Sequence, residues 1–282
     1  MNWIENKTIL TPTSGFLGTG YTHTINAYVG CQFAQAACGT FCYARWSPMA
    51  RGRAWDFYGA KLKTRAAYRE EYNRIKEPQD GRPRPLKIYM SSVTDPYLPS
   101  ETTLGLTRGL LEEMVERPPD VLVIQTHNTL VRRDLDLIEQ ISSLCELWVS
   151  ITVETDMERI LGFPPHASSP AKRVDTLKLF RDAGIKCQAV VSPLLPLQDP
   201  IAFANRLGEA CDRVILDHYL IGDGSKNGLR TKRTNFISLL ESEGFSEWTR
   251  IEKLWEIRDV FVSTLGPERV LVSKDGFNAV GQ

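Results

Sequence analysis

The chain has 282 residues, of which 42% are hydrophobic and 24% are charged, values that are ordinary for a globular protein. Its 34 basic side chains equal its 34 acidic ones, so no net field would draw it to nucleic acid or to an acidic membrane surface. No apolar run approaches the roughly 18 residues of a membrane helix, and Met1–Leu10 has no signal-peptide core, which together predict a cytoplasmic protein.

Short β-rich segments alternate with segments of helical periodicity along most of the chain. Val121–Gln125 and Gln188–Val191 are nearly continuous apolar runs, typical of parallel strands that are buried on both faces. Gly184 follows the periodic segment Pro170–Ala183, at the position of a helix C-cap glycine. The predicted strands are Tyr21–Val29, Leu86–Ser92, Val121–Thr126, Leu147–Val153, Lys186–Val191 and Arg213–Asp217, and the predicted helices are Asp56–Lys76, Thr103–Arg117, Arg132–Leu144, Pro170–Ala183 and Ile201–Cys211.

This alternation predicts an α/β fold with a parallel sheet and right-handed crossovers. The economical interpretation is a partial, TIM-like (β/α)6 barrel over residues 1–217, and a doubly wound sheet is the alternative. Residues 218–282 are expected to form a C-terminal, α-rich extension that packs on the barrel rather than an independent domain. They include a Gly-rich, basic segment at 222–235, a helix near Ser246–Leu265 and a short strand near Val270.

Three cysteines, Cys31, Cys38 and Cys42, lie within twelve residues in a loop after the first predicted strand. Clustered thiolates are soft donors that select iron–sulfur clusters or zinc. Zinc needs a fourth ligand, and no second Cys or His pair is present, so the count favours an open site. The spacing alone still allows a cluster, a zinc ion or structural thiols. The other cysteines are scattered and are predicted to be buried small hydrophobic residues: Cys145, Cys187 and Cys211.

The segments Asn26-Ala-Tyr-Val-Gly-Cys31 and Phe41-Cys42-Tyr-Ala-Arg45 resemble the signature of the radical SAM superfamily, in the branch of spore photoproduct lyase and its uncharacterised relatives. The cysteine spacing is wider than is usual in that branch, with six residues between the first two cysteines and three between the last two. Further segments similar to the family follow at successive predicted strand ends: Thr94-Asp-Pro-Tyr97, Thr126-His127, Ser150-Ile-Thr-Val-Glu154, Arg173 and Val191-Ser-Pro-Leu-Leu-Pro196.

The resemblance implies a (β/α)6 partial barrel that holds a [4Fe-4S] cluster on Cys31, Cys38 and Cys42. It also implies S-adenosylmethionine (SAM) as the cofactor, bound to the open iron and cleaved to a 5′-deoxyadenosyl radical that abstracts hydrogen from a substrate. The expected partner is a reductase of the ferredoxin or flavodoxin type, and the expected assembly is a monomer or a weak dimer. The substrate is not indicated.

Six residues are candidate contacts with SAM. Ser150 and Thr152 share one face of a strand, and Glu154 continues that face to the strand's end, where a carboxylate would accept from ribose hydroxyls or an ammonium group. Arg173 begins the following helix and would pair with a carboxylate of the cofactor. The full set of candidates is Tyr43, Thr94, Ser150, Thr152, Glu154 and Arg173.

His127 and Glu154 are the candidate catalytic residues. His127 stands where the family often has a cofactor-facing lysine, but an imidazole is shorter and is only partly charged at neutral pH. It is therefore expected to alter the cofactor contact or to face the substrate. Ser92, or Val93 at the next step, stands where spore photoproduct lyase has its hydrogen-donating cysteine, and neither donates hydrogen easily, so repair of DNA dimers is not predicted.

The competing interpretation is a non-catalytic nucleic-acid-binding protein that is stabilised by zinc or a cluster. Such a protein would explain the cysteines but not the polar residues at several strand ends. The acidic neighbours Glu70, Glu71 and Glu77 and the zero net charge favour a solvated helix face over a binding surface. The segment that would contact nucleic acid is basic and aromatic: Arg51, Arg53, Lys61, Lys63, Arg65 and Arg69, with Trp55, Phe57, Tyr58 and Tyr68.

Overall fold

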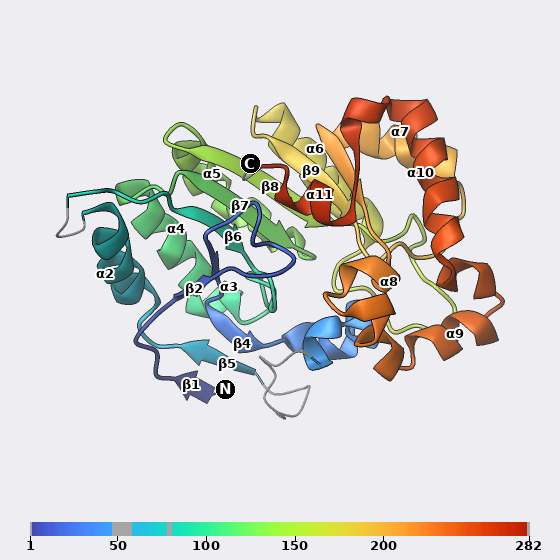
Figure 1. Ribbon diagram of the computed structural model, residues 1–282, viewed down its shortest axis with the longest axis horizontal. Coiled ribbons are helices and arrows are strands. Elements are labelled where there is room, and N and C mark those ends of the chain that lie inside the picture. Colours follow the sequence, from blue (N-terminus) through green and yellow to red (C-terminus); the bar gives the residue numbers. More distant parts are fainter. Residues whose placement is uncertain (1, 47–57, 78–80, 281–282) are drawn as a thin grey trace.

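The computed structural model describes residues 2–46, 58–77 and 81–280. Within these ranges the largest element is an eight-stranded sheet in the order β11-β10-β9-β8-β7-β6-β3-β2, parallel except for β2 (Leu10–Pro12) at one edge (Figure 1). From β3 to β11 the strand order follows the chain, so the sheet is wound in one direction, and the doubly wound alternative is wrong. The other strands are β3 (His23–Ile25), β6 (Lys87–Met90), β7 (Val121–Thr126), β8 (Glu146–Thr152), β9 (Cys187–Val191), β10 (Arg213–Leu216) and β11 (Val270–Val272).

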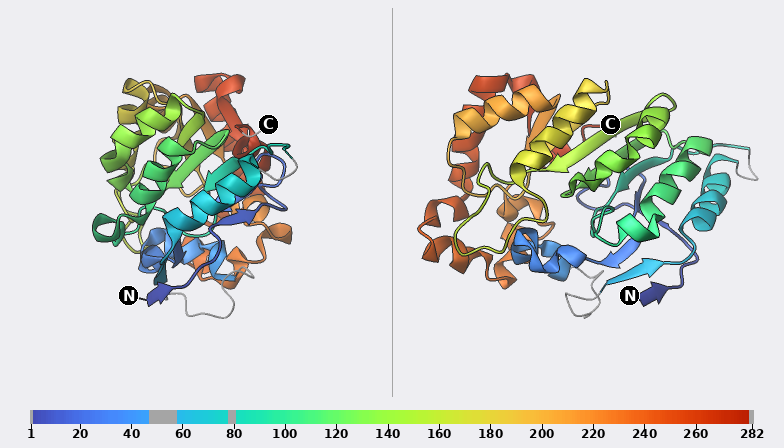
Figure 2. Two further views of the ribbon diagram at one scale, coloured as in Figure 1. Left: turned by 90° about the vertical axis from the view of Figure 1, so that its left-hand side faces the viewer. Right: turned by 180° about the vertical axis from the view of Figure 1, so that it is seen from behind.

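Helices cover one face of this sheet and enclose the main hydrophobic core, as Figure 2 shows from behind. They include α4 (Leu106–Glu116), α5 (Leu135–Ser142), α6 (Pro170–Asp182) and α7 (Pro200–Ala210), and α10 (Ile251–Leu265) packs on α7. The remaining helices are α1 (Ala37–Phe41), α2 (Thr64–Lys76), α3 (Glu101–Leu104), α8 (Tyr219–Gly222), α9 (Phe236–Ser242) and α11 (Ser273–Asn278).

Several predicted elements are confirmed, and the local signals explain them. All five residues of β9 are buried, as expected for a parallel strand with both faces covered. Helix α6 begins where Ser169 accepts a hydrogen bond from the backbone N–H of Lys172 and Pro170 occupies the first turn. It ends before Gly184, whose φ of 76° is readily adopted by glycine.

The predicted strand Tyr21–Val29 is two strands in two sheets. β3 pairs with β6, whereas β4 (Tyr28–Gly30) pairs with β5 (Tyr58–Lys61), which in turn pairs with β1 (Asn2–Ile4). The chain changes sheets after Ile25, because Ala27 already bonds through its carbonyl to the backbone N–H of Lys61 at 3.1 Å. This turn carries the cysteine segment away from the main sheet.

Three predicted helices are shorter than their periodicity indicated, among them Arg132–Leu144, of which α5 covers Leu135–Ser142. Residues 56–57 of the predicted helix Asp56–Lys76 lie outside the described residues, Tyr58–Lys61 is strand β5, and the helix begins at Thr64. Gly59 lets β5 approach β1, since a Cβ there would lie 2.5 Å from Cδ1 of Ile4. The predicted helix 103–117 is divided into α3 and α4 by Gly105, with a φ of 59°.

Residues 16–21 and helix α11 meet on the sheet face that the main helices leave uncovered. Phe277 of α11 packs there with Tyr21 and Tyr89, and the hydroxyl of Tyr21 donates to the Phe277 carbonyl at 3.0 Å. The amide of Asn278 donates to the carbonyl of Phe16 at 2.8 Å. The N-terminal segment and α11 therefore form one wall above the sheet, and the site described below uses that wall.

Candidate active site

The cysteine segment folds into a 3-10 turn followed by helix α1. Cys31 directly follows β4, and Cys38 and Cys42 are four residues apart on α1 and its C-cap, so the last two share one helix face. Gly39 permits this compact winding, because a Cβ at that position would lie 2.0 Å from the carbonyl oxygen of Ala34. The wide cysteine spacing is therefore taken up by helical turns.

All three thiols are partly buried and line one cavity of about 520 Å³. Burial raises the pKa of Cys31 to about 12, with a further rise from the nearby Cys42, and burial raises the pKa of Cys42 to about 11. Among the described residues no three His, Cys, Asp or Glu side chains are placed to hold a single metal ion. A four-iron cluster does not require its thiolates to converge on one ion, since each thiolate binds its own iron. Three thiols that line one cavity satisfy this requirement.

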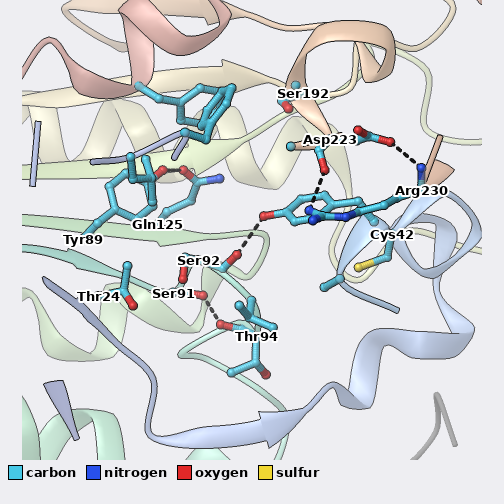
Figure 3. Close-up of a pocket in the computed structure, with 18 of the residues that line it drawn as sticks. Thr24, Cys42, Tyr89, Ser91, Ser92, Thr94, Gln125, Ser192, Asp223 and Arg230 are labelled. Atoms are coloured by element: carbon cyan, nitrogen blue, oxygen red, sulfur yellow. Dashed lines mark hydrogen bonds between the residues drawn. The ribbon is translucent and has the colours of Figure 1, made fainter. Parts of the chain in front are cut away.

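The cavity lies at the carboxyl ends of the parallel strands. Thr94 follows β6, His127 follows β7, Ser192 follows β9 and Asp217 follows β10, and all four line the cavity. Figure 3 shows Thr94 and Cys42 around this space together with Tyr89 and Gln125 of the strands. The wall is completed by residues 11–17 and by residues of the C-terminal extension: Tyr219, Gly222, Asp223, Gly224, Arg230, Thr231 and Phe277.

His127 joins the cavity to a buried chain of charges. Its Nδ1 lies 3.5 Å from Oδ2 of Asp95, and its Nε2 lies 3.3 Å from Oε1 of Glu154. Burial by itself would lower the pKa of His127, but the hydrogen bonds and charges of Asp95 and Glu154 outweigh burial and raise it to about 9. The imidazole is therefore protonated at neutral pH, which corrects the expectation from sequence that it is only partly charged.

Glu154 and Arg173 form the buried end of this chain. The guanidinium of Arg173 donates to Oε2 of Glu154 at 2.6 Å, and the two residues are 1% and 2% exposed, respectively. Burial opposes ionisation of Glu154, yet the charges of Arg173 and His127 outweigh it and hold the pKa of Glu154 far below its ordinary value. Among the described residues neither Glu154 nor Arg173 lines the cavity, so their contact with a cofactor stays a prediction.

Tyr43 and Thr94 connect the cysteine segment to the end of β6. The hydroxyl of Tyr43 donates to the carbonyl of Ser92 at 2.7 Å, and the hydroxyl of Thr94 donates to the carbonyl of Gly30. Both residues line the cavity beside Cys42 or Cys31. Both side chains are therefore at the cavity, while their contact with a cofactor stays a prediction.

Ser150 and Thr152 lie deeper, inside β8. Their residues are 0% and 1% exposed, and neither is among the described residues that line the cavity. The hydroxyl of Ser150 accepts from Gln188 at 3.1 Å, and that of Thr152 accepts from Gln125 at 3.3 Å. The shared strand face is thus polar and hydrogen-bonded, while direct contact with SAM stays a prediction.

The structure adds cavity residues that the sequence did not single out. Asp217 had a detectable signal, because it is an acid directly after the buried run Val214–Leu216, at a strand's carboxyl end. Gln125 had a weaker signal as a polar residue near the end of apolar β7. Phe16 and Phe277 had none, since they come from opposite ends of the chain and only tertiary packing brings them together.

Two of the four described basic residues of the basic, aromatic segment, Arg65 and Arg69, form ion pairs. Arg65 pairs with Glu112 at 2.9 Å and Arg69 pairs with Glu113 at 2.8 Å, while Tyr68 is fully buried. Paired guanidinium groups are poorly available to phosphates. Four members of the segment lie outside the described residues: Arg51, Arg53, Trp55 and Phe57.

No family model matches the chain. It is 35% identical over 178 residues to the uncharacterized protein MJ0683 of Methanocaldococcus jannaschii, a match that covers 63% of this chain and 62% of the relative. It is 31% identical over 180 residues to the uncharacterized protein ORF301 of Acidianus two-tailed virus, covering 61% and 56%, respectively. The uncharacterized protein Rv2578c of Mycobacterium tuberculosis is 26% identical over 180 residues, covering 62% and 50%. The chain thus spans 50% to 62% of the length of these curated relatives.

Among solved structures, SuiB of Streptococcus suis bound to precursor peptide SuiA gives a TM-score of 0.48 at 13% identity, covering 76% of this chain and 42% of that one. The cobalamin-dependent S-adenosylmethionine radical enzyme OxsB gives a TM-score of 0.44 at 12% identity, covering 88% and 32%. Scores at this level do not establish a common fold. In the part of the chain that the structure describes, no helix combines the length and the apolar character needed to cross a bilayer.

Proposed function

We propose that this protein is a radical SAM enzyme built on a partial (β/α)6 barrel, with a [4Fe-4S] cluster held by Cys31, Cys38 and Cys42. The observation that carries the proposal is the placement of all three thiols on one cavity at the carboxyl ends of parallel strands. The resemblance of the segments around the cysteines supports it, as does the one-directional strand order. When bound, the cluster and SAM would supply a 5′-deoxyadenosyl radical that removes a hydrogen atom from a substrate.

The residues of this chain would bind and orient the cofactor. Protonated His127 presents a cation to the cavity, the charge that a lysine would otherwise supply, and can donate a hydrogen bond to a carboxylate. Glu154 is a positioning residue, because it fixes His127 and is itself held by Arg173. Tyr43 and Thr94 would contact the cofactor beside the thiols.

Ser150, Thr152 and Arg173 are proposed to act from beneath the cavity, through the hydrogen bonds that hold β8 and Glu154. Electrons would come from a small reductase of the ferredoxin or flavodoxin type.

The test is anaerobic reconstitution with iron and sulfide, followed by addition of dithionite and SAM. We expect a brown protein that contains about four irons, the nuclearity of this cluster type, and that releases 5′-deoxyadenosine. Cys38→Ala and Cys42→Ala should lose both colour and nucleoside, whereas the matched control Cys145→Ala, outside the cavity, should keep both. A colourless zinc protein, or nucleoside release equal in wild type and Cys42→Ala, would refute the proposal.

A further inference from the structure

Asp217 is a buried carboxylate on the cavity wall whose hydrogen bonds are incomplete. It is 3% exposed, and its Oδ2 accepts from the hydroxyl of Ser192 at 2.9 Å. Its Oδ1 is buried and makes no hydrogen bond with any described residue. The hydroxyl of Ser273 and the backbone N–H of His218 also lie beside the carboxylate, and both lower the pKa of Asp217. Buried polar atoms are almost always paired, so an acid on a cavity wall with one oxygen outside any regular hydrogen bond has room for a further donor.

The charges around Asp217 do not supply that donor. No described Lys, Arg or His side chain forms an ion pair with it, and the nearby Asp223 repels it. Arg230 also lines the cavity, but its guanidinium donates to the backbone carbonyl of Asp223 at 3.1 Å. Next in the chain, burial lowers the pKa of His218 to about 4, so that imidazole is neutral. Burial raises the pKa of Asp217 to about 6, which leaves it mostly ionised at neutral pH without a cation.

The cavity also has an apolar, aromatic wall. Phe16 and Phe277 contact each other edge to face, with ring centroids 5.5 Å apart, and both line the cavity. Tyr89 lines it as well, and its hydroxyl donates to Gln125 (Figure 3). One cavity therefore combines an aromatic, apolar wall with the Asp217 carboxylate, which has no cation beside it among the described residues. This pairing is suited to an apolar or aromatic group that carries a cation.

We propose, resting on the function proposed above, that Asp217 anchors the substrate and that the substrate is a protonated amine attached to an apolar or aromatic body. The ammonium group would donate to the Asp217 carboxylate and supply the cation that it lacks. Phe16, Tyr89 and Phe277 would cover the apolar body. Ser192 would hold the carboxylate in place for this contact.

Matched probes test this inference on the anaerobically reconstituted protein. Isothermal titration with phenethylamine and with neutral phenethyl alcohol should show about ten- to hundredfold tighter binding of the amine, since its charge-assisted hydrogen bond is the main difference. Asp217→Asn should abolish this preference. Asp175→Asn, on the exposed face of α6, is the matched control and should retain it.

Equal binding of the two probes by the wild type would overturn the inference, as would an amine preference that survives in Asp217→Asn. A fall in SAM affinity that matches the loss of amine preference would assign Asp217 to the cofactor instead, and would also overturn it. The comparison of probes on the wild type does not depend on the folding of any variant. Failure of the proposed function is seen separately, as wild-type protein that binds the amine but releases no 5′-deoxyadenosine with dithionite and SAM.

Discussion

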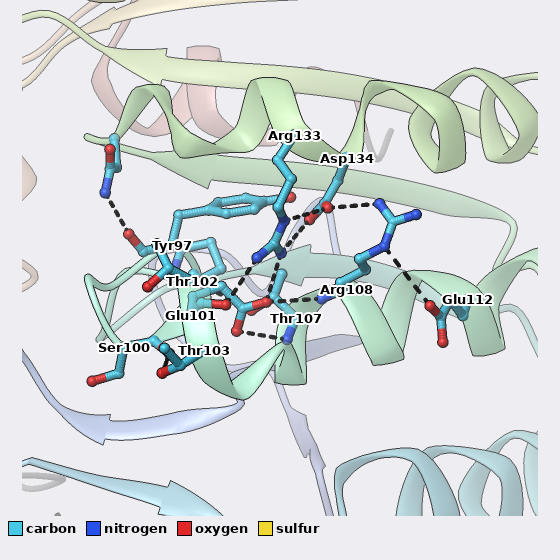
Figure 4. A network of polar contacts seen from close by, with 12 residues as sticks. Tyr97, Ser100, Glu101, Thr102, Thr103, Thr107, Arg108, Glu112, Arg133 and Asp134 are labelled. Carbon is cyan, nitrogen blue, oxygen red and sulfur yellow. Dashed lines mark hydrogen bonds and ion pairs between the residues drawn. The ribbon is translucent and has the colours of Figure 1, made fainter.

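Glu101 and Asp217 are both buried carboxylates, but their surroundings differ. Glu101, 0% exposed at the start of α3, accepts from the backbone N–H groups of Thr107 and Arg108 at 3.0 and 3.1 Å. It also accepts from the guanidinium of Arg133 at 2.8 Å (Figure 4). Each oxygen of Glu101 therefore has donors inside the protein, and the network holds α3, α4 and the segment before α5 together.

Asp217 lines the cavity and accepts from Ser192, with Ser273 and the backbone N–H of His218 nearby, but no described cation pairs with it. Glu154 is intermediate, since Arg173 saturates one oxygen and cavity-facing His127 approaches the other. The comparison teaches that burial alone does not separate structural from functional carboxylates. What separates them is whether the protein itself completes their hydrogen bonds.

The largest effect that distinguishes the two carboxylates should come from Glu101→Ala. It leaves two buried N–H groups and a guanidinium without their partner, so we expect the free energy of unfolding to fall by about 3–5 kcal/mol. Urea denaturation at pH 7 measures this change. Glu112→Ala is the control, because Glu112 is 40% exposed and pairs with Arg65, and it should cost less than about 1 kcal/mol. If both variants lose the same small amount, the Glu101 network is not structural.

The next effect concerns His127 and its dependence on pH. The pKa of His127 rises from 6.5 to about 9 on folding, so its stabilising contribution is complete below about pH 6.5 and is lost as pH rises through 9. His127→Gln should therefore cost up to about 3 kcal/mol at pH 6, at about 1.4 kcal/mol per pKa unit, and much less at pH 10. Thermal and urea unfolding of both proteins at the two pH values measure this. A cost that does not change with pH would mean that His127 is neutral.

The smallest effect has the opposite sign. Folding raises the pKa of Asp217 from 3.8 to about 6, so the wild type loses stability as pH rises through this window, whereas Asp217→Asn does not. At pH 7.5 we expect the variant to be more stable than the wild type by about 1–3 kcal/mol, a difference that disappears near pH 4. Urea unfolding at both pH values measures it. A variant that is less stable at pH 7.5 would place Asp217 with the structural carboxylates, beside Glu101.

Much of the architecture could be predicted because its signals are local. The buried run of β9 and the caps Ser169 and Gly184 of α6 act within a few residues of chain. The predicted element boundaries were wrong where a contact between distant segments decides them. At Gly59 the close approach of β1 accompanies a strand where a helix was expected. Edge strand β2 has only three residues, one of them proline, and such a short segment carries no periodicity.

By itself, the sequence determined the three cysteines, the strands near them and the α/β alternation, because all of these follow from residue spacing, whereas the strand order was decided by the tertiary structure. Only the tertiary structure decided the charge state of His127, since Asp95 and Glu154 lie in the segments after β6 and β8 and contact it only in the folded protein. The tertiary structure alone also shows that no described cation lies beside the Asp217 carboxylate. A pKa and an unpaired hydrogen bond depend on everything that packs around a group, and that environment is assembled from residues that lie far apart in the chain.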